Sequence, residues 1–324
     1  MEKSELMLEI YDLKKHFPIK KGLMQRTAGY VKAVDGVSFS IKRGQTMGLV
    51  GESGCGKTTV GRTLLRLLSP TGGRSIVDGV DIFSLSKKEL RLMRPKMQLI
   101  FQDPYSSLDP RLPIGAIIGE AVAEHGIAQK KEIRDYVLKA MQDCELRPYQ
   151  YDRYPHEFSG GQRQRVCIAR ALALNPELVV ADEPVSALDV SVQAQIINLL
   201  RDLQEKRSLS YLFISHDLSV VEYISDTVGV MYLGSLVEFA TKPELFKHPL
   251  HPYTKALLSA APTPDPDAKT NRIVLKGDIP SPANPPPGCR FHTRCPECKK
   301  VCEEDAPAFK EHSPGHWASC HFAQ

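Results

Sequence analysis

The nine residues Gly51–Thr59 constrain this chain more than any others, because GESGCGKTT fits the phosphate-binding pattern G-x-x-x-x-G-K-[ST]. A short apolar run, Thr46–Val50, precedes the pattern and suits a buried strand, and helical spacing follows it. Unpaired N–H groups and the dipole at a helix N-terminus attract anions, and glycines let the backbone approach phosphate oxygens. The sequence therefore predicts a strand, a phosphate loop and a helix.

Two side chains of this loop are expected to have tasks of their own. Lys57 would reach the β- and γ-phosphates of a nucleotide, and the hydroxyl of Thr58 would ligate Mg²⁺. The whole loop is predicted to bind ATP, through Gly51, Glu52, Ser53, Gly54, Cys55, Gly56, Lys57, Thr58 and Thr59.

The front of the chain predicts an antiparallel sheet. Leu6–Phe17 and Tyr30–Ile41 alternate in polarity like half-buried strands, and an insert rich in Gly and Lys separates them. Within Ser75–Ile82, Asp78-Gly79 lies between apolar pairs and indicates a hairpin.

Later strands alternate with helices, which predicts a parallel sheet. The expected strands are Lys96–Asp103, Glu177–Glu183 and Ser208–Ser215. Ligands of such sheets bind beyond the carboxyl ends of the strands. Polar residues stand at or just past these ends, and we expect them to converge near the phosphate loop: Gln102, Asp182, Glu183 and His216.

Composition places the chain among globular proteins, with 324 residues, 42% of them hydrophobic and 25% charged. The net charge of +4 is too weak to indicate nucleic-acid binding. No run approaches the roughly 20 apolar residues that cross a bilayer, and the start lacks the apolar core of a signal peptide. We expect a soluble chain that docks on a membrane protein.

The C-terminal end differs in composition from the rest. Pro262–Gly288 contains eight prolines in 27 residues, which predicts an extended linker. Five of the eight cysteines follow between Cys289 and Cys320, and in a cytosolic nucleotide-binding protein such a cluster favours a metal over disulfides. The predicted domains are 1–261, with a helical subdomain at about 104–160, a linker at 262–288 and a cysteine-rich module at 289–324.

Four further motifs follow in a fixed order: FSGGQRQR from Phe158, VVADEP from Val179, SALD from Ser186 and ISHD from Ile214. Together with the phosphate loop they resemble the motifs of ATP-binding cassette (ABC) ATPases, over about Leu6–Ala260. The resemblance implies an α/β fold with a parallel-sheet core, an antiparallel β subdomain and an inserted helical subdomain.

The resemblance also implies roles in phosphoryl transfer to water. Asp182 would hold Mg²⁺ through water, and Glu183 would act as general base or orient the attacking water. His216 would contact the γ-phosphate. Gln102 would be a Mg²⁺ ligand and would respond both to bound Mg²⁺ and to the docked membrane partner.

In this family two ATPase subunits sandwich ATP, so a second subunit is implied. The residues implied to contact nucleotide held by the opposite subunit, or to line that interface, are Ser159, Gly160, Gly161, Gln162 and Asp189. An aromatic ring stacks on adenine in the family, and Phe17 fits its spacing best, with Tyr30 as the alternative.

The C-terminal tail narrows the resemblance to one group of ABC ATPases. HPYTKALLSAAP from His251 and the later cysteine-rich segment are similar to the tails of ATPase subunits from dipeptide and oligopeptide importers. Those subunits imply a [4Fe–4S] cluster on Cys289, Cys295, Cys302 and Cys320. Cys298 is an extra cysteine, and zinc remains the alternative, with possible further ligands in His292, His312, His316 and His321.

The resemblance therefore implies the ATPase subunit of a bacterial-type peptide importer, nearest the second of two paralogous ATPases, peripheral on the cytoplasmic face of the inner membrane. Its partners would be a second ATPase, two membrane permeases and, indirectly, an external binding protein. One alternative is an importer of the same family for nickel or glutathione, since this chain does not select cargo. Another is a soluble ABC ATPase acting on nucleic acid, which the single cassette and low charge disfavour.

Overall fold

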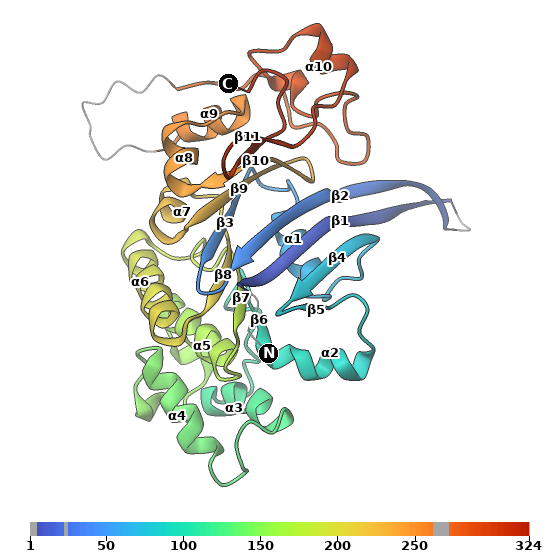
Figure 1. The fold of residues 1–324 in the computed structure, drawn as a ribbon. Coiled ribbons are helices and arrows are strands. Elements are labelled where there is room, and N and C mark those ends of the chain that lie inside the picture. Colours follow the sequence, from blue (N-terminus) through green and yellow to red (C-terminus); the bar gives the residue numbers. More distant parts are fainter. Residues whose placement is uncertain (1–4, 23–24, 262–271, 324) are drawn as a thin grey trace, which may run out of the picture. The chain divides into compact units, whose positions relative to one another are not determined.

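The computed structural model describes residues 5–22, 25–261 and 272–323 (Figure 1). The first ten residues of the predicted linker, 262–271, lie outside this set. The chain forms two compact units: the first comprises Met1–Met7, Ile41–Gln45 and Ser84–Ile214, and the second Leu8–Ser40, Thr46–Phe83 and Ser215–Gln324.

The first unit contains three parallel strands, β6 (Met97–Ile100), β7 (Leu178–Asp182) and β8 (Ser210–Ile214). β7 lies between the other two, with Leu178 opposite both Met97 and Ser210. Every residue of β7 and β8 is buried, as expected for parallel strands that are covered on both faces. The predicted parallel arrangement of these three segments is therefore confirmed.

The helices of the first unit are α2 (Lys87–Met93), α3 (Ile114–Glu124), α4 (Ile133–Asp143), α5 (Gly160–Leu172) and α6 (Val190–Arg207), with short 3₁₀ turns η1 (Arg94–Lys96), η2 (Pro148–Gln150) and η3 (Pro155–Glu157). α3, α4 and α5 pack against one another, and α5 also contacts β6 and α6. The apolar face of α4 is buried through Val137 and Met141, and Cys144 at its end is fully buried. The core position predicted for Cys144 is confirmed.

The second unit contains most of a four-stranded sheet in the order β2-β1-β4-β5. Its strands are β1 (Leu6–Lys21), β2 (Arg26–Lys42), β4 (Gly72–Val77) and β5 (Val80–Asp81). The β4–β5 turn is the predicted hairpin, with φ of 51° at Asp78 and 76° at Gly79. The first two strands are longer than predicted, because β1 continues to Lys21 and β2 begins at Arg26. Most described residues of the predicted insert therefore belong to these strands, and that part of the prediction is wrong.

The second unit also contributes β3 (Thr46–Val50), parallel to β9 (Thr227–Tyr232), which forms a hairpin with β10 (Ser235–Thr241). Beyond β10 the sheet continues with β12 (His316–Ala318) and β11 (Lys310–Ser313). Its helices are α1 (Lys57–Leu64), α7 (Leu218–Ile224), α8 (Lys242–Lys247), α9 (Pro252–Ser259), α10 (Lys300–Glu304) and the turn η4 (His292–Arg294). The cysteine-rich segment thus adds two strands to the sheet that contains β3.

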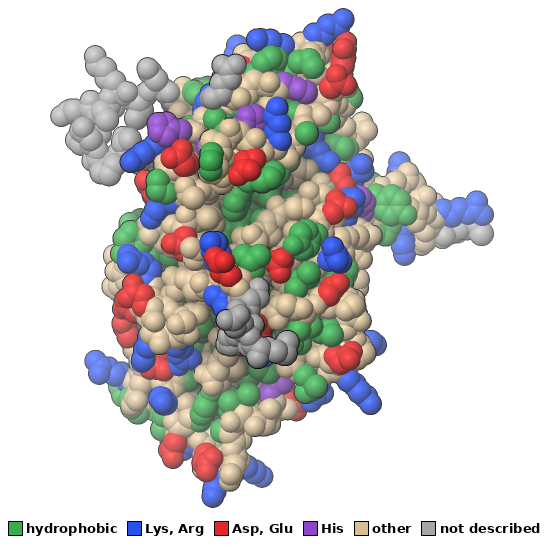
Figure 2. Space-filling view, viewed as in Figure 1, with side chains coloured by type: hydrophobic (Ala, Val, Ile, Leu, Met, Phe, Trp, Pro, Cys, Tyr) green, Lys and Arg blue, Asp and Glu red, His purple; other side chains and the backbone are tan. Residues whose placement is uncertain are grey.

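Charged side chains of both signs are interspersed over the face drawn in Figure 2. Among the described residues, no helix combines the length and the apolar character needed to cross a bilayer.

Candidate nucleotide site and cysteine pocket

The phosphate loop joins β3 to α1, as predicted, and two of its glycines are required by close backbone contacts. Gly51 has φ of 151°, and a Cβ there would lie 2.3 Å from the carbonyl oxygen of Met231. Gly56 has φ of 108°, and a Cβ there would lie 2.2 Å from the carbonyl oxygen of Ala33. A side chain at either position would displace backbone, so the loop conformation depends on glycine.

Lys57 is the first residue of α1, and it is only 5% exposed. Its Nζ donates hydrogen bonds to the carbonyl oxygens of Gly51 at 2.7 Å and Glu52 at 3.2 Å. The ammonium group therefore lies against the loop backbone. Cys55 is also buried, and burial, the largest effect, raises the pKa of its thiol.

Glu52 is fixed to the rest of its unit by both backbone and side chain. Its N–H donates to the hydroxyl of Tyr253, on α9, at 2.9 Å. Its carboxylate accepts two hydrogen bonds from the guanidinium of Arg294, in η4, at 2.7 and 3.0 Å. Parallel hydrogen bonds of this kind are among the strongest that side chains make.

The predicted catalytic carboxylates lie in the first unit, at the end of β7. Asp182 is its last residue and is 1% exposed. The chain then turns through Glu183, whose φ is 46° and whose N–H donates to the carbonyl oxygen of Ile214 at 2.9 Å. Gln102, which follows β6, donates from Nε2 to Oε2 of Glu183 at 3.0 Å. Gln102, predicted as a catalytic and magnesium-binding residue, and Glu183 are therefore in contact.

Four of the five predicted interface residues lie at the start of α5. Ser159 is its N-cap and forms a capping box with Gln162, whose Oε1 accepts the Ser159 N–H at 3.1 Å. Gly160 and Gly161 begin the helix between them. The fifth, Asp189, caps α6 by accepting the N–H of Val192 at 3.0 Å. These residues have local structural tasks besides any contact with nucleotide.

The remaining predicted nucleotide-site residues lie in the second unit. His216 follows Ser215, whose N–H donates to the carbonyl oxygen of Leu49 in β3 at 3.2 Å, and the imidazole is exposed. Of the two candidate aromatic rings, Phe17 is half-buried on β1 beneath Lys15, whose Nζ is 4.7 Å from the ring centroid. Tyr30, on β2, is 51% exposed. The choice between Phe17 and Tyr30 stays open.

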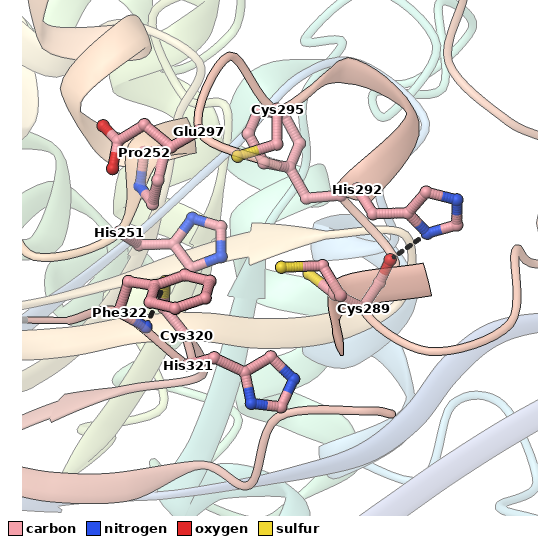
Figure 3. A pocket seen from close by; sticks show the side chains of 11 residues that line it. His251, Pro252, Cys289, His292, Cys295, Glu297, Cys320, His321 and Phe322 are labelled. Carbon is pink, nitrogen blue, oxygen red and sulfur yellow. Dashed lines mark hydrogen bonds between the residues drawn. The ribbon is translucent and has the colours of Figure 1, made fainter. Parts of the chain in front are cut away.

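The predicted ligand cysteines line one pocket, which contains about 330 Å³ of empty space including open solvent. Cys289 and Cys295 flank η4, and Cys302 lies in α10. Cys320 follows β12, and Figure 3 shows its side chain, with those of Cys289 and Cys295, around a common hollow. The Phe322 N–H lies 3.4 Å from the Cys320 sulfur. Cys298 is not among the residues that line this pocket.

Three of the thiols that line the pocket have a raised pKa. Burial is the largest effect on the pKa of Cys289, Cys295 and Cys320, and it raises each of them, to about 12 for Cys295. Within the described ranges, no group of three or more His, Cys, Asp or Glu side chains is placed to hold one metal ion. The predicted metal is therefore not supported by a preformed single-ion site.

Three of the four histidines considered as zinc ligands have other contacts. Nδ1 of His292 lies 2.9 Å from the carbonyl oxygen of Cys289 (Figure 3). Nε2 of His316 lies 2.7 Å from the buried Glu238 carboxylate, and Nε2 of His321 lies 2.9 Å from a carbonyl oxygen. His312 does not line the cysteine pocket.

Two residues that contact the phosphate loop, Tyr253 and Arg294, were not predicted from the sequence. Tyr253 lies within the segment that carried the resemblance to importer tails, but nothing in that segment pointed to Glu52. Arg294 lies 242 positions from Glu52 along the chain, and no local pattern marks the pair.

Comparison with known proteins assigns the chain to two sequence families. Residues 34–186 match the family described as ABC transporter, and residues 237–302 match the C-terminal region of oligopeptide/dipeptide transporters. The oligopeptide transport ATP-binding protein AppF of Bacillus subtilis is 57% identical over 98% of this chain and 97% of its own length. A putative peptide import ATP-binding protein of Brucella ovis is 54% identical, over 97% of each chain.

Solved structures show the same fold. The ATP-binding cassette MJ0796, a dimer in a post-hydrolysis state bound to ADP and Pi, has a TM-score of 0.65 and 27% identity, over 73% of this chain and 99% of its own. CbiO1 of Clostridium perfringens, part of the transporter complex CbiONQ, has a TM-score of 0.64 and 26% identity, over 76% and 92% of the two chains. The predicted ATPase fold is therefore confirmed.

Proposed function

This chain belongs to the ABC transporter ATPases whose C-terminal region is that of oligopeptide/dipeptide transporters, and we propose that it hydrolyses ATP to power peptide import. The observation that carries the proposal is the 57% identity to an oligopeptide transport ATP-binding protein over nearly the full length of both chains. Residues 237–302 also match the C-terminal region of oligopeptide/dipeptide transporters, which supports a peptide as the cargo.

The proposed reaction is transfer of the γ-phosphoryl group of ATP to water. Lys57 would neutralise phosphate charge, while Thr58 and Asp182 would hold Mg²⁺. Glu183 would orient or deprotonate the attacking water, and the Gln102 amide in contact with its carboxylate at 3.0 Å would set the orientation of that carboxylate. His216 would contact the γ-phosphate.

The proposed working unit contains two ATPase subunits. The fold is similar to a cassette that forms dimers, which supports an ATP-sandwich arrangement here. In it, Ser159 to Gln162 at the start of α5 would face nucleotide bound by the opposite subunit, and Asp189 would line the interface. The second subunit is proposed to be a paralogue.

Closure of the two ATPase subunits would drive the conformational change of two permeases in the membrane. This chain would lie at the cytoplasmic side of the permeases as a peripheral subunit. Exposed apolar side chains in the segment that follows β6 support a docking surface there: Phe101 is 37% exposed, Tyr105 59% and Leu112 38%. An external binding protein would deliver the peptide to the permeases.

Replacing Glu183 tests the proposed chemistry. Glu183→Gln is expected to abolish ATP turnover while preserving ATP-dependent dimerisation, because the amide keeps the shape of the carboxylate but does not accept a proton. The matched control is Glu145→Gln, a surface carboxylate of the same unit paired with Arg165. Wild-type hydrolysis by Glu183→Gln would refute the assigned mechanism.

Co-purification tests the proposed assembly. Tagged full-length protein is extracted from membranes with detergent, without oxygen, and its companions are identified by mass spectrometry. Two polytopic membrane proteins and a second ATPase are expected. Recovery of ribosomes or DNA-repair proteins instead would favour a soluble ATPase that acts on nucleic acid.

We also propose that the cysteine pocket holds a metal group, for which a [4Fe–4S] cluster is the favoured form and Zn²⁺ the alternative. Four thiols around one hollow are the donor set of such a cluster, and the position of Cys298 outside the lining supports the choice of the other four. When bound, the group would cross-link the tail, and its role would be structural or regulatory.

Metal and acid-labile sulfide contents after anaerobic purification test this part of the proposal. Cys295→Ser should lose the group, whereas Cys298→Ser should retain it. Zinc without sulfide would select the alternative, and equal loss from both variants would refute the ligand assignment.

A further inference from the structure

The peptide unit and side chain of Glu52 are held from three directions. Tyr253 accepts its N–H at 2.9 Å, Lys57 donates to its carbonyl oxygen at 3.2 Å, and Arg294 binds its carboxylate through two hydrogen bonds. Two of these three groups, Tyr253 in α9 and Arg294 in η4, come from the C-terminal part of the second unit. The phosphate loop is therefore anchored to residues outside the nucleotide-binding motifs.

The ion pair of Arg294 and Glu52 is well shielded from solvent. The Arg294 side chain is 8% exposed and that of Glu52 is 26% exposed. Tyr232 covers the guanidinium, with its ring centroid 5.9 Å away. A carboxylate in a loop that receives phosphates would repel them, so its neutralisation by Arg294 favours anion binding.

The same contacts connect the phosphate loop to the cysteine pocket. Arg294 directly precedes Cys295, and Phe291, three residues earlier, lines the pocket. The Phe291 ring packs on Tyr232 and Tyr253, with centroid distances of 5.2 and 5.3 Å. Directly packed and hydrogen-bonded side chains therefore connect the loop that carries Cys289 and Cys295 to Glu52.

We propose that Arg294 and Tyr253 are positioning residues for ATP binding, which hold the phosphate loop through Glu52 and make nucleotide affinity depend on the cysteine-rich segment. The inference rests on the proposed ATP site. Neither residue touches nucleotide in this proposal: Arg294 neutralises and fixes the Glu52 side chain, and Tyr253 fixes its peptide N–H.

The test is isothermal titration of full-length protein with a non-hydrolysable ATP analogue and Mg²⁺. Arg294→Met removes two charge-assisted hydrogen bonds and should raise Kd at least tenfold, and Tyr253→Phe leaves the Glu52 N–H without its acceptor and should raise Kd about tenfold. Arg294→Lys keeps the charge but not the two-pronged geometry, and it should lie between wild type and Arg294→Met. The KM for ATP should rise in the same order, with kcat at saturation unchanged.

The matched control is Arg290→Met. Arg290 lies on the same loop and also forms a part-buried ion pair, but with Asp35, and it donates a hydrogen bond to the carbonyl oxygen of Leu233. Its removal should lower the melting temperature about as much as Arg294→Met while leaving Kd within twofold of wild type. The comparison separates an effect on the phosphate loop from a general loosening of the segment.

A double-variant cycle supplies a signature that a structural role would not produce. Once Glu52→Gln has removed the carboxylate, adding Arg294→Met should change Kd by less than twofold. Additive effects, or Kd values within twofold of wild type for both Arg294→Met and Tyr253→Phe, would overturn the inference. A wild-type protein that does not bind the analogue would refute the ATP site itself.

Discussion

Truncation of the Glu238 side chain should strongly weaken the attachment of the C-terminal tail to β10. The side chain lies in β10 and is fully buried, and it accepts the N–H groups of Leu250 and His251 at 2.8 and 2.9 Å and contacts Nε2 of His316 at 2.7 Å. In Glu238→Ala two backbone donors and one imidazole lose their partner. Each orphaned donor costs about 1–3 kcal/mol, and breaking a buried pair costs about 3–5 kcal/mol in all.

Trp317 is the single tryptophan of the chain, and it lies in β12 beside His316. Its fluorescence during urea denaturation therefore follows the β10–β12 pairing, where Phe239 is opposite Trp317. Glu238→Ala is expected to lower the free energy of unfolding seen by Trp317 by about 3–5 kcal/mol.

The control for this prediction is Glu304→Ala, which removes an exposed ion pair with Lys300 and should cost under about 0.5 kcal/mol. Glu238→Gln keeps one acceptor oxygen and should lie between the control and Glu238→Ala. A loss below about 1 kcal/mol in Glu238→Ala would mean that water replaces the carboxylate, and would refute the reasoning from burial.

Two further predictions concern the first unit. A Cβ on Gly115 would lie 2.3 Å from the Tyr151 ring, so Gly115→Ala should lower the free energy of unfolding by about 1–3 kcal/mol, measured by urea denaturation; unchanged stability would show that the ring moves freely. Burial raises the pKa of Asp143, but hydrogen bonds from Lys206 and Arg207 outweigh it and hold the pKa below the usual 3.8. The unfolded chain then binds the proton first, so this contribution to stability is present above pH 3.8 and is lost as pH falls through the lower folded value. Asp143→Asn should flatten the acid limb of stability against pH, and an identical acid limb in the variant would contradict the assignment.

The sequence by itself predicted the phosphate loop and the strand that precedes it. That was possible because the motif is contiguous: Gly51 and Gly56 stand where backbone contacts exclude a Cβ, and Thr46–Val50 is continuously apolar. The parallel strands β6, β7 and β8 were predictable for the same local reason. The contact of Gln102 with Glu183 follows from the rule that carboxyl ends of parallel strands share one edge of a sheet.

Only the tertiary structure showed which parts of the protein the tail contacts. Nothing in the local sequence indicated that β12 would pair with β10, because three-residue strands carry little periodicity. The structure places the four predicted ligand cysteines around one pocket and leaves Cys298 outside its lining, an arrangement in space that their order along the chain does not show. Arg294 and Glu52 meet across 242 positions through packing that local preferences do not encode. Motif residues are determined by short-range backbone geometry, whereas the contacts that hold them in place are determined by the fold.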